Sequence, residues 1–252
     1  MSISVDNEHL RQLREAAAEE LVQLVDEHAA GMDVAAVRMV LRNSFVSTEI
    51  IERLMKERRL LAIYELRRDL ARHNKTPQVH SMRLIPTLFW RDLMEIGLDM
   101  RAPPLVRRGA ERHLVARVSS LAVGERMSIG RRAGHGVIMH LRFDSDSRVI
   151  GALLDNPRLN EGLLMPLVSH EGAPPEVLKT VAGNRRWGRR YPIRVALVRN
   201  PRTPPVIAVG LLGGLKKMDQ KAVAQDVRLP TVVRRRARLL LGDPAESRNR
   251  LR

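Results

Sequence analysis

Part of the chain is a second copy of another part, and this internal repeat restricts the folds that the 252 residues can adopt. Residues 64–114 align without a gap with residues 191–241 at an offset of 127, and 18 of the 51 aligned pairs are identical. Ordinary composition would give about three or four identities. Self-similarity at a fixed offset is the sequence signature of stacked structural repeats, so we expect a repeat architecture.

A shorter pattern inside the repeat predicts pairs of helices. In this pattern a helix ends near an Asn, and a Pro follows. A short turn and a Thr-Pro pair then precede the next helix, as in residues 200–204. Asn tolerates the left-handed conformation that ends a helix, and the Pro after it blocks continuation. Thr is expected to cap the next helix, whose first turn accepts Pro. Such starts are predicted at Thr76-Pro77, Ala102-Pro103, Ala173-Pro174, Thr203-Pro204 and Leu229-Pro230.

Helical spacing of apolar residues extends over most of the chain, and strand alternation is hard to find. We therefore expect an all-α fold in three parts. An acidic N-terminal helical cap covers residues 1–34, a helical-repeat region covers residues 35–241, and a flexible tail covers residues 242–252. The cap lies in a segment, residues 1–63, that holds 8 Lys and Arg against 11 Asp and Glu.

The element VRxxLxxNPxTP, which ends here at Thr203-Pro204, resembles the leucine-rich repeat variant (LRV) and the broader HEAT-like class of helical repeats. The resemblance covers residues 35–241 and is strongest in the two copies. It implies a right-handed α-solenoid of stacked helix pairs, closed at its start by the N-terminal capping helix. The iron–sulfur segment of the LRV arrangement is not carried over, because the chain has no Cys. Proteins of this kind share no common activity, so the resemblance implies a fold.

Composition excludes several classes of function. The absence of Cys excludes disulfides, thiolate catalysis and Cys-held metal sites. Seven aromatic residues disfavour a surface that reads single-stranded nucleic acid by stacking. The longest uncharged stretch, Thr203 to Leu215, is shorter than the about 20 residues of a membrane-spanning helix. The N-terminus does not resemble a secretory signal, so a soluble cytoplasmic protein is expected.

An excess of arginine is the main functional signal. The chain has 44 Lys and Arg against 28 Asp and Glu, a net charge of +16, and 38 of the basic residues are Arg. Stacked repeats bring equivalent positions into rows, so clusters of arginine can form a stripe that binds phosphates in a salt-dependent way. The predicted polyanion-binding residues are Arg131, Arg132, Arg185, Arg186, Arg189, Arg190, Lys216, Lys217, Arg235 and Arg236.

A structural role for the repeated arginines competes with this interpretation. Helical repeats of the HEAT-like class commonly use an Asp–Arg ladder between neighbouring units. Two pairs of repeated acids are available for such a ladder, and two pairs of repeated arginines could face them. The acids are Asp92/Asp219 and Asp99/Asp226, and the arginines are Arg67/Arg194 and Arg107/Arg234.

No catalytic, metal or cofactor site is predicted. The eight His are scattered, and no HExxH, GxSxG or phosphate-binding P-loop motif is present. Trp90 and Asp92 are the candidates for one enzymatic alternative. HEAT-like alkylpurine DNA glycosylases hold a cationic lesion with aromatic residues and an Asp, and a cation does bind well on an aromatic face. Aromatic residues that fill gaps between repeats are the simpler interpretation.

Three functions therefore stay open at the level of sequence. The leading hypothesis is a non-enzymatic helical-repeat module that binds a polyanion, with DNA or structured RNA as the preferred partner. A protein scaffold that holds an acidic partner is the second. Self-association belongs to it, because the acidic N-terminal segment could contact the basic region of another copy. The third is the glycosylase.

Overall fold

The computed structural model describes residues 2–242, and all regular structure in that part of the chain is helical. Residues 243–252, most of the predicted tail, lie outside the described residues. The helices form two units, one up to Arg117 and one from Val118 onward. None of the helices between residues 2 and 242 is both long and apolar enough to cross a lipid bilayer.

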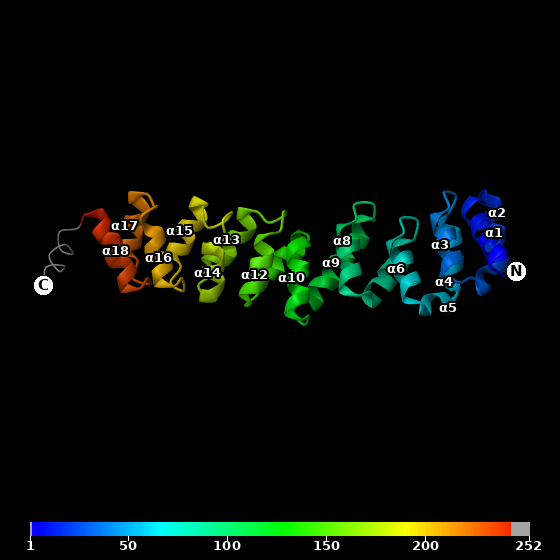
Figure 1. Ribbon diagram of the computed structural model, residues 1–252, viewed down its shortest axis with the longest axis horizontal. Helices are drawn as coiled ribbons and strands as arrows, with labels where there is room; N and C mark the ends of the chain where they lie inside the picture. The colour runs from blue at the N-terminus through cyan, green and yellow to red at the C-terminus, as the bar shows by residue number, and fades with distance from the viewer. Residues whose placement is uncertain (1, 243–252) are drawn as a thin grey trace. The chain divides into compact units, whose positions relative to one another are not determined.

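The first unit is built from nine α-helices and two short 3₁₀ helices among its described residues (Figure 1). The α-helices are α1 (Ser2–Glu15), α2 (Ala18–His28), α3 (Val34–Arg42), α4 (Thr48–Lys56), α5 (Arg58–Ala62), α6 (Tyr64–Arg72), α7 (Gln78–Leu84), α8 (Trp90–Leu98) and α9 (Pro104–Val118), whose last residue is the first of the next unit. The 3₁₀ helices are η1 (Ala29–Gly31) and η2 (Ile85–Thr87). Helix α3 packs on α1 and on α6, while α2 packs on α4.

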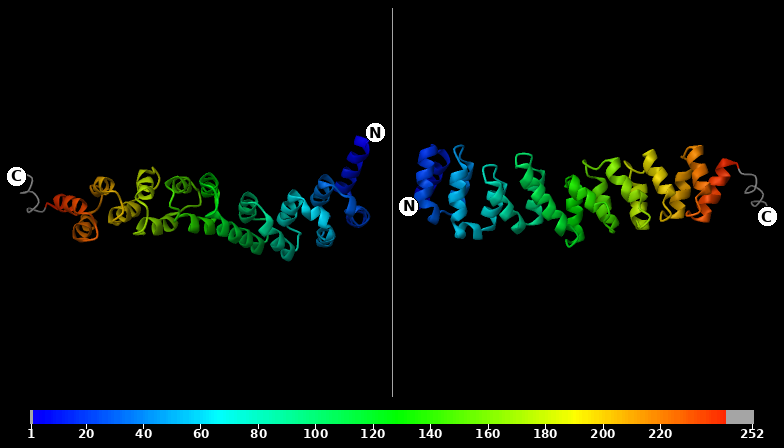
Figure 2. Two further views of the ribbon diagram at one scale, coloured as in Figure 1. Left: turned by 90° about the horizontal axis from the view of Figure 1, so that it is seen from below. Right: turned by 180° about the vertical axis from the view of Figure 1, so that it is seen from behind.

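The second unit contains the helices from α10 to α18. They are α10 (Val123–Arg132), α11 (His135–Leu141), α12 (Ser147–Leu154), α13 (Glu161–Ser169), α14 (Pro175–Gly183), α15 (Tyr191–Arg199), α16 (Pro205–Leu212), α17 (Lys217–Gln225) and α18 (Thr231–Leu241). Several of them pack on the next helix but one: α12 contacts α10 and α14, α15 contacts α13 and α17, and α16 contacts α18. Within this unit, α12, α14, α16 and α18 follow one another on one side, and α13, α15 and α17 lie on the other (Figures 1 and 2).

Local sequence explains the individual helices, as α4 illustrates. Ser47 caps its start, because the Ser47 hydroxyl oxygen accepts a hydrogen bond from the Ile50 N–H at 3.3 Å. Arg53 and Lys56 occupy the last turn, where positive charge is favoured by the helix dipole. Ile50, Ile51 and Leu54 form one buried face of this helix. The helix therefore combines a capped start with an apolar face that must be covered by a neighbour.

Helix boundaries repeat at the offset found in the sequence. Helices α3, α4, α6 and α8 correspond in both bounds to α13, α14, α15 and α17 after a shift of 127 residues. Helices α7 and α9 share their first residue with α16 and α18 in the same way. The structural repeat thus begins at Val34, which is 30 residues before the sequence identity becomes clear. The bounds of α3 and α4 therefore agree with those of α13 and α14 although most side chains differ.

The predicted helix starts lie close to the observed ones, but the capping roles are different. Helices α7 and α16 begin directly after Pro77 and Pro204. The preceding threonines do not cap them: the Thr76 hydroxyl donates to the Leu70 carbonyl at 2.7 Å, and Thr203 donates to Leu197 at 2.6 Å. The predicted role of Thr was therefore wrong. Each hydroxyl satisfies a carbonyl at the end of the preceding helix, which would otherwise be buried without a partner.

The predicted left-handed Asn at helix ends was also wrong. Asn43 and Asn200 have extended backbones, and among the described residues only Gly242 has a positive φ. These Asn side chains instead join neighbouring helices. The Asn200 amide donates to the Val168 carbonyl at 2.7 Å and to the His170 carbonyl at 2.9 Å. Asn is used here for its two N–H donors and one acceptor rather than for its backbone freedom.

His73 occupies the position in the first unit that Asn200 occupies in the second. Its Nε2 contacts the Leu41 carbonyl at 3.1 Å, and its Nδ1 accepts the Lys75 N–H at 3.2 Å. This arrangement requires the neutral imidazole, with its proton on Nε2. Burial lowers the pKa of His73 below its ordinary value of 6.5, and the charge of Lys75 acts in the same direction.

We expect the first unit to lose stability as the pH falls below 6.5, because the unfolded chain then binds a proton at His73 that the folded chain refuses. One proton limits the loss to less than about 1.4 kcal/mol per pH unit. Urea unfolding of the wild type and of His73→Asn at pH 7.5 and pH 5.5 measures it. Asn makes the equivalent contacts at position 200, so His73→Asn should fold and be less sensitive to pH. Equal sensitivity in both proteins would contradict this role of His73.

Candidate nucleic-acid interface

The C-terminal ends of α10, α12 and α14 lie side by side, and hydrogen bonds connect them. The buried amide of Asn156, just after α12, donates to the Gly130 carbonyl at 2.7 Å and to the Ala133 carbonyl at 3.2 Å. The indole Nε1 of Trp187, just after α14, donates to the Leu154 carbonyl at 2.9 Å. These contacts use main-chain acceptors at the helix ends, so they fix the positions of the three ends relative to one another.

The turn after α14 carries four arginines and is anchored from within. The Asn184 side-chain oxygen accepts the N–H groups of Arg186 at 2.9 Å and of Trp187 at 3.1 Å. Trp187 is fully buried, with 0% of its surface exposed. A Cβ added to Gly188 would collide with the Ala182 carbonyl, so the turn requires glycine at this place. The buried ring and the tight turn leave the arginine side chains on the surface.

Three arginines of this region have structural roles. Arg158 donates from Nη1 to the Arg132 carbonyl at 3.2 Å. Arg186 donates to the Leu159 carbonyl at 3.2 Å, and its guanidinium lies 4.6 Å from the centre of the Trp187 ring. Arg190 pairs with Glu161 at 3.5 Å and also lies over the Trp187 ring. Each side chain therefore connects its own turn with a turn or helix earlier in the chain.

Four other arginines are exposed and have no side-chain partner among the described residues. They are Arg131 and Arg132 in the last turn of α10, and Arg185 and Arg189 in the turn after α14. We call the surface formed by all seven of these residues the basic edge: Arg131, Arg132, Arg158, Arg185, Arg186, Arg189 and Arg190. Two nearby acids, the exposed Asp155 and the paired Glu161, do not balance the seven cations. The edge therefore holds surplus positive charge.

The structure gives the remaining predicted residues other surroundings. Lys217 donates from Nζ to the Leu240 carbonyl at 2.6 Å, and the Lys216 ammonium lies 5.3 Å from the centre of the Tyr191 ring. Arg235 and Arg236 are exposed within α18. No described contact joins Lys216, Lys217 or Arg236 to the basic edge. Arg158 was missed in the sequence, although Asn156-Pro157-Arg158 repeats the Asn200-Pro201-Arg202 pattern.

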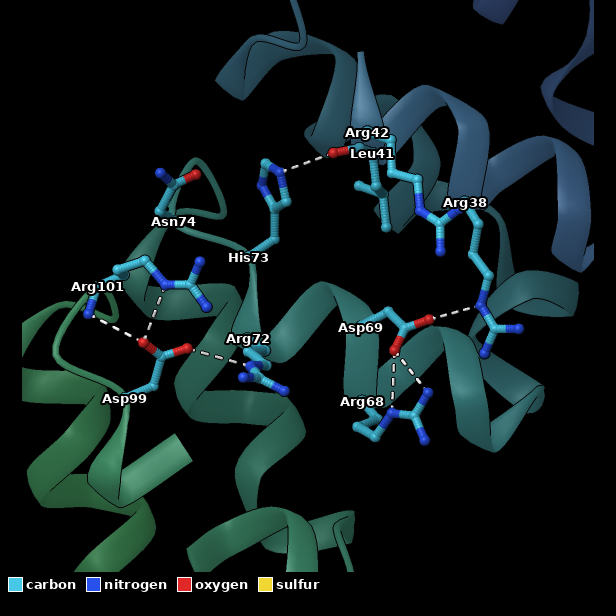
Figure 3. Close-up of a pocket in the computed structure, with 10 residues that line it drawn as sticks. All are labelled: Arg38, Leu41, Arg42, Arg68, Asp69, Arg72, His73, Asn74, Asp99 and Arg101. Carbon is cyan, nitrogen blue, oxygen red and sulfur yellow. Dashed lines mark hydrogen bonds and ion pairs between the residues drawn. The ribbon is translucent and has the colours of Figure 1, made fainter. Parts of the chain in front are cut away.

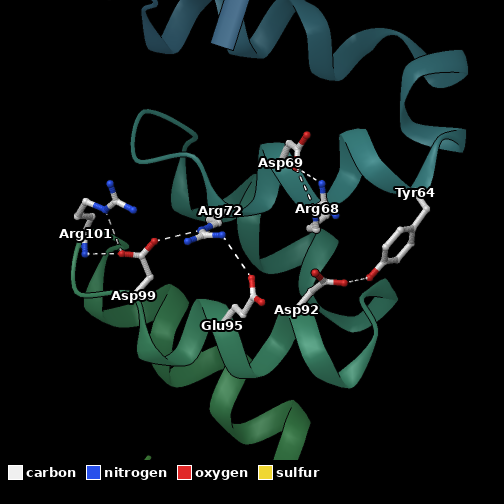
Figure 4. Close-up of polar contacts among 8 residues, drawn as sticks. All are labelled: Tyr64, Arg68, Asp69, Arg72, Asp92, Glu95, Asp99 and Arg101. Carbon is white, nitrogen blue, oxygen red and sulfur yellow. Dashed lines mark hydrogen bonds and ion pairs between the residues drawn. The ribbon is translucent and has the colours of Figure 1, made fainter. Parts of the chain in front are cut away.

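Asp92 of the predicted glycosylase pair is already engaged by Tyr64, at the start of α6 (Figure 4). The Tyr64 hydroxyl donates to the Asp92 carboxylate and accepts the Phe89 N–H at 3.0 Å. The same arrangement recurs at an offset of 127, where Tyr191 donates to Asp219. Burial and the hydrogen bond to the carboxylate raise the pKa of both tyrosines above the ordinary 10.0. Trp90, whose ring faces Arg91 at 5.2 Å, stays a predicted site residue with Asp92.

Of the repeated acids, Asp99 and Asp226 do form ion pairs, but with partners other than those considered from the sequence. Asp99 pairs with Arg72 at 3.1 Å and with Arg101 at 3.3 Å. Asp226 pairs with Arg228 at 2.7 Å. The Arg101 N–H, followed by the guanidiniums of Arg72 and Arg101, lowers the pKa of Asp99. These acids follow a helix end, where the arginine two positions later faces them, and Arg72 of α6 also reaches Asp99.

The described part of the chain has no group of three or more His, Asp or Glu placed to hold a metal ion. Comparison of the whole chain with protein-family models, with curated proteins and with solved structures finds no match. The basic edge is therefore interpreted from its own geometry and charge.

Proposed function

We propose that the protein is a HEAT- and LRV-like right-handed α-solenoid that binds a polyanion, with DNA or structured RNA as its partner. Packing of several helices of the second unit on the next helix but one supports the solenoid, as does the recurrence of helix bounds at an offset of 127. Repeats of this kind present equivalent positions in rows along a surface. The basic edge occupies such a row at the ends of α10, α12 and α14.

The four arginines without partners carry the proposal. At the basic edge, Arg158, Arg186 and Arg190 connect helix ends, whereas Arg131, Arg132, Arg185 and Arg189 contribute charge that no described residue neutralises. Their anchors, Asn156 and Trp187, hold the helix ends in place before any ligand binds. Arginine forms two parallel hydrogen bonds with a phosphate, and its planar guanidinium loses less entropy for each hydrogen bond formed than the ammonium of lysine. The partner is therefore a phosphate backbone read without base contacts.

We expect the wild type to bind a short DNA duplex with micromolar or tighter affinity at about 50 mM salt, and the variant R131Q/R132Q/R185Q/R189Q to bind at least tenfold more weakly. Each lost phosphate contact reduces the slope of log K against log salt by about 0.9, so the slope should decrease by about three to four. Fluorescence anisotropy across a salt series measures both quantities.

A matched control carries the same change of charge elsewhere. Arg14, Arg83, Arg108 and Arg112 are exposed in the first unit, and their side chains have no partner among the described residues. The variant R14Q/R83Q/R108Q/R112Q should retain affinity within about threefold. Equal weakening in both variants would assign binding to total charge and overturn the proposed edge. Tight binding of an acidic protein that survives nuclease treatment, with no DNA or RNA binding, would favour the scaffold.

A further inference from the structure

A cavity of about 840 Å³ in the first unit is lined by charged groups from α3, α6 and the turn after α8 (Figure 3). Its ten lining residues are Arg38, Leu41, Arg42, Arg68, Asp69, Arg72, His73, Asn74, Asp99 and Arg101. Five of them are arginines and two are aspartates. None belongs to the residues predicted from the sequence to bind a polyanion. We call this cavity the arginine cavity.

Two aspartates hold four of the arginines in place without neutralising them. The Asp69 carboxylate forms ion pairs with the guanidinium of Arg38 from α3 and with that of Arg68 from its own helix, each with an N···O distance of 2.8 Å. Asp99 is shared in the same way by Arg72 and Arg101.

Arg42 is exposed and has no side-chain partner among residues 2–242. Even with Glu95, which pairs with Arg72 from outside the cavity, the five cations face three acids. The cavity therefore keeps an excess of fixed positive charge.

The second unit contains the same cavity with different chemistry. A cavity of about 510 Å³ lies there on residues that match the arginine cavity at an offset of 127. The matched pairs are Arg38/Met165, Arg42/Ser169, Arg68/Val195, Asp69/Ala196, Arg72/Arg199, His73/Asn200, Asn74/Pro201 and Arg101/Arg228.

Both units have the ion pair in the turn after α8 or α17, since Asp226 pairs with Arg228 as Asp99 pairs with Arg101. Three arginines are found in the first cavity alone. Their places in the second are taken by Met165, Ser169 and Val195, and helices of the same bounds form around them. The scaffold therefore does not require Arg38, Arg42 and Arg68, and a structural role does not account for them.

We propose that the arginine cavity binds a small anion that carries several phosphate groups. Guanidiniums fixed by shared carboxylates present their remaining N–H groups to a ligand, and phosphates accept such pairs of N–H groups. Arg38 and Arg68 are about one third exposed, at 34% and 35%, so solvent screens their charge less than that of a fully exposed side chain. A single phosphate is small for a cavity of this volume, whereas a chain of phosphates reaches arginines on both α3 and α6.

The residues of the second unit supply the test. The variant R38M/R42S/R68V/D69A gives the arginine cavity the side chains that its counterpart carries. Isothermal titration of the full chain with tripolyphosphate at about 50 mM salt should give one site with micromolar affinity in the wild type and at least tenfold weaker binding in the variant. R14Q/R83Q, which lowers the net charge by the same two units, should bind as the wild type does.

A single substitution protects the test against loss of fold. The Arg42 side chain is exposed and forms no hydrogen bond or ion pair with a described residue, so Arg42→Ser should leave the helical circular dichroism unchanged and weaken tripolyphosphate binding several-fold. Unchanged affinity in both cavity variants, or equal weakening in R14Q/R83Q, would overturn the proposal. The basic-edge variant R131Q/R132Q/R185Q/R189Q should keep tripolyphosphate binding, and R38M/R42S/R68V/D69A should keep duplex binding. A cavity variant that loses duplex alone would show that this cavity binds a nucleic-acid backbone instead, and would overturn the small-anion assignment.

Discussion

Replacing Trp187 with alanine is expected to lower the free energy of unfolding of the second unit by about 4 kcal/mol. The indole is fully buried behind the arginine turn, and its Nε1–H donates to the Leu154 carbonyl at 2.9 Å. Alanine leaves a cavity in place of the indole, and it leaves the Leu154 carbonyl at the end of α12 without its hydrogen-bond donor. Urea unfolding followed by circular dichroism measures the loss, and hydrogen exchange in α12 and α14 locates it.

The first unit provides the control for this substitution. Leu60 occupies the equivalent place there and is also fully buried. Trp187→Leu should therefore cost less than Trp187→Ala, because leucine refills part of the space. Trp187→Ala should also weaken duplex binding more than Trp187→Leu does, since the ring anchors the turn that carries Arg185 and Arg189. A Trp187→Ala protein as stable as the wild type would contradict the anchoring role.

Replacing Asn156 with alanine has the second largest expected effect, a loss of about 3 kcal/mol. The side chain is fully buried and makes three hydrogen bonds, two to carbonyls near the end of α10 and one from the Arg158 N–H at 2.8 Å. Alanine leaves all three main-chain groups without this partner. Buried polar groups that lose a partner carry their full desolvation cost.

Asn74 is the matched control, because it is an exposed asparagine in a turn whose side chain makes no hydrogen bond to a described residue. Asn74→Ala should change the free energy of unfolding by less than about 0.5 kcal/mol. Denaturant midpoints of the two variants and the wild type give the comparison. If both alanine variants matched the wild type, Asn156 would not hold α10 and α12 together.

The sequence predicts the helices well where backbone chemistry is local. Proline after a polar residue fixes a helix start, so α7, α14, α16 and α18 begin within one residue of the predicted prolines. The partners of side chains are not local. The side chains of Thr76, Asn200 and Asp99 each bind a group on a neighbouring turn or helix. The same three residue types would also be suitable as simple helix caps, so the sequence does not distinguish the two roles.

The basic edge and the arginine cavity differ in what the sequence can reveal. Runs of adjacent arginine at Arg131-Arg132 and Arg185-Arg186 are visible in the sequence, although nothing there indicates that they share a surface. The arginine cavity has no such run across its helices: Arg38 and Arg68 are 30 residues apart, yet both pair with Asp69. Low identity in this part of the repeat also hid its counterpart in the second unit.

By itself the sequence determined an all-helical chain, an internal repeat with an offset of 127 and an arginine excess, because these follow from local propensity and composition. Tertiary structure alone decided which arginines contact another residue of the chain and which have no such partner. That distinction depends on whether a carbonyl, a carboxylate or an aromatic ring comes within hydrogen-bond or van der Waals distance. Helix packing sets such distances between residues about 30 positions apart, and no pattern within one helix encodes them.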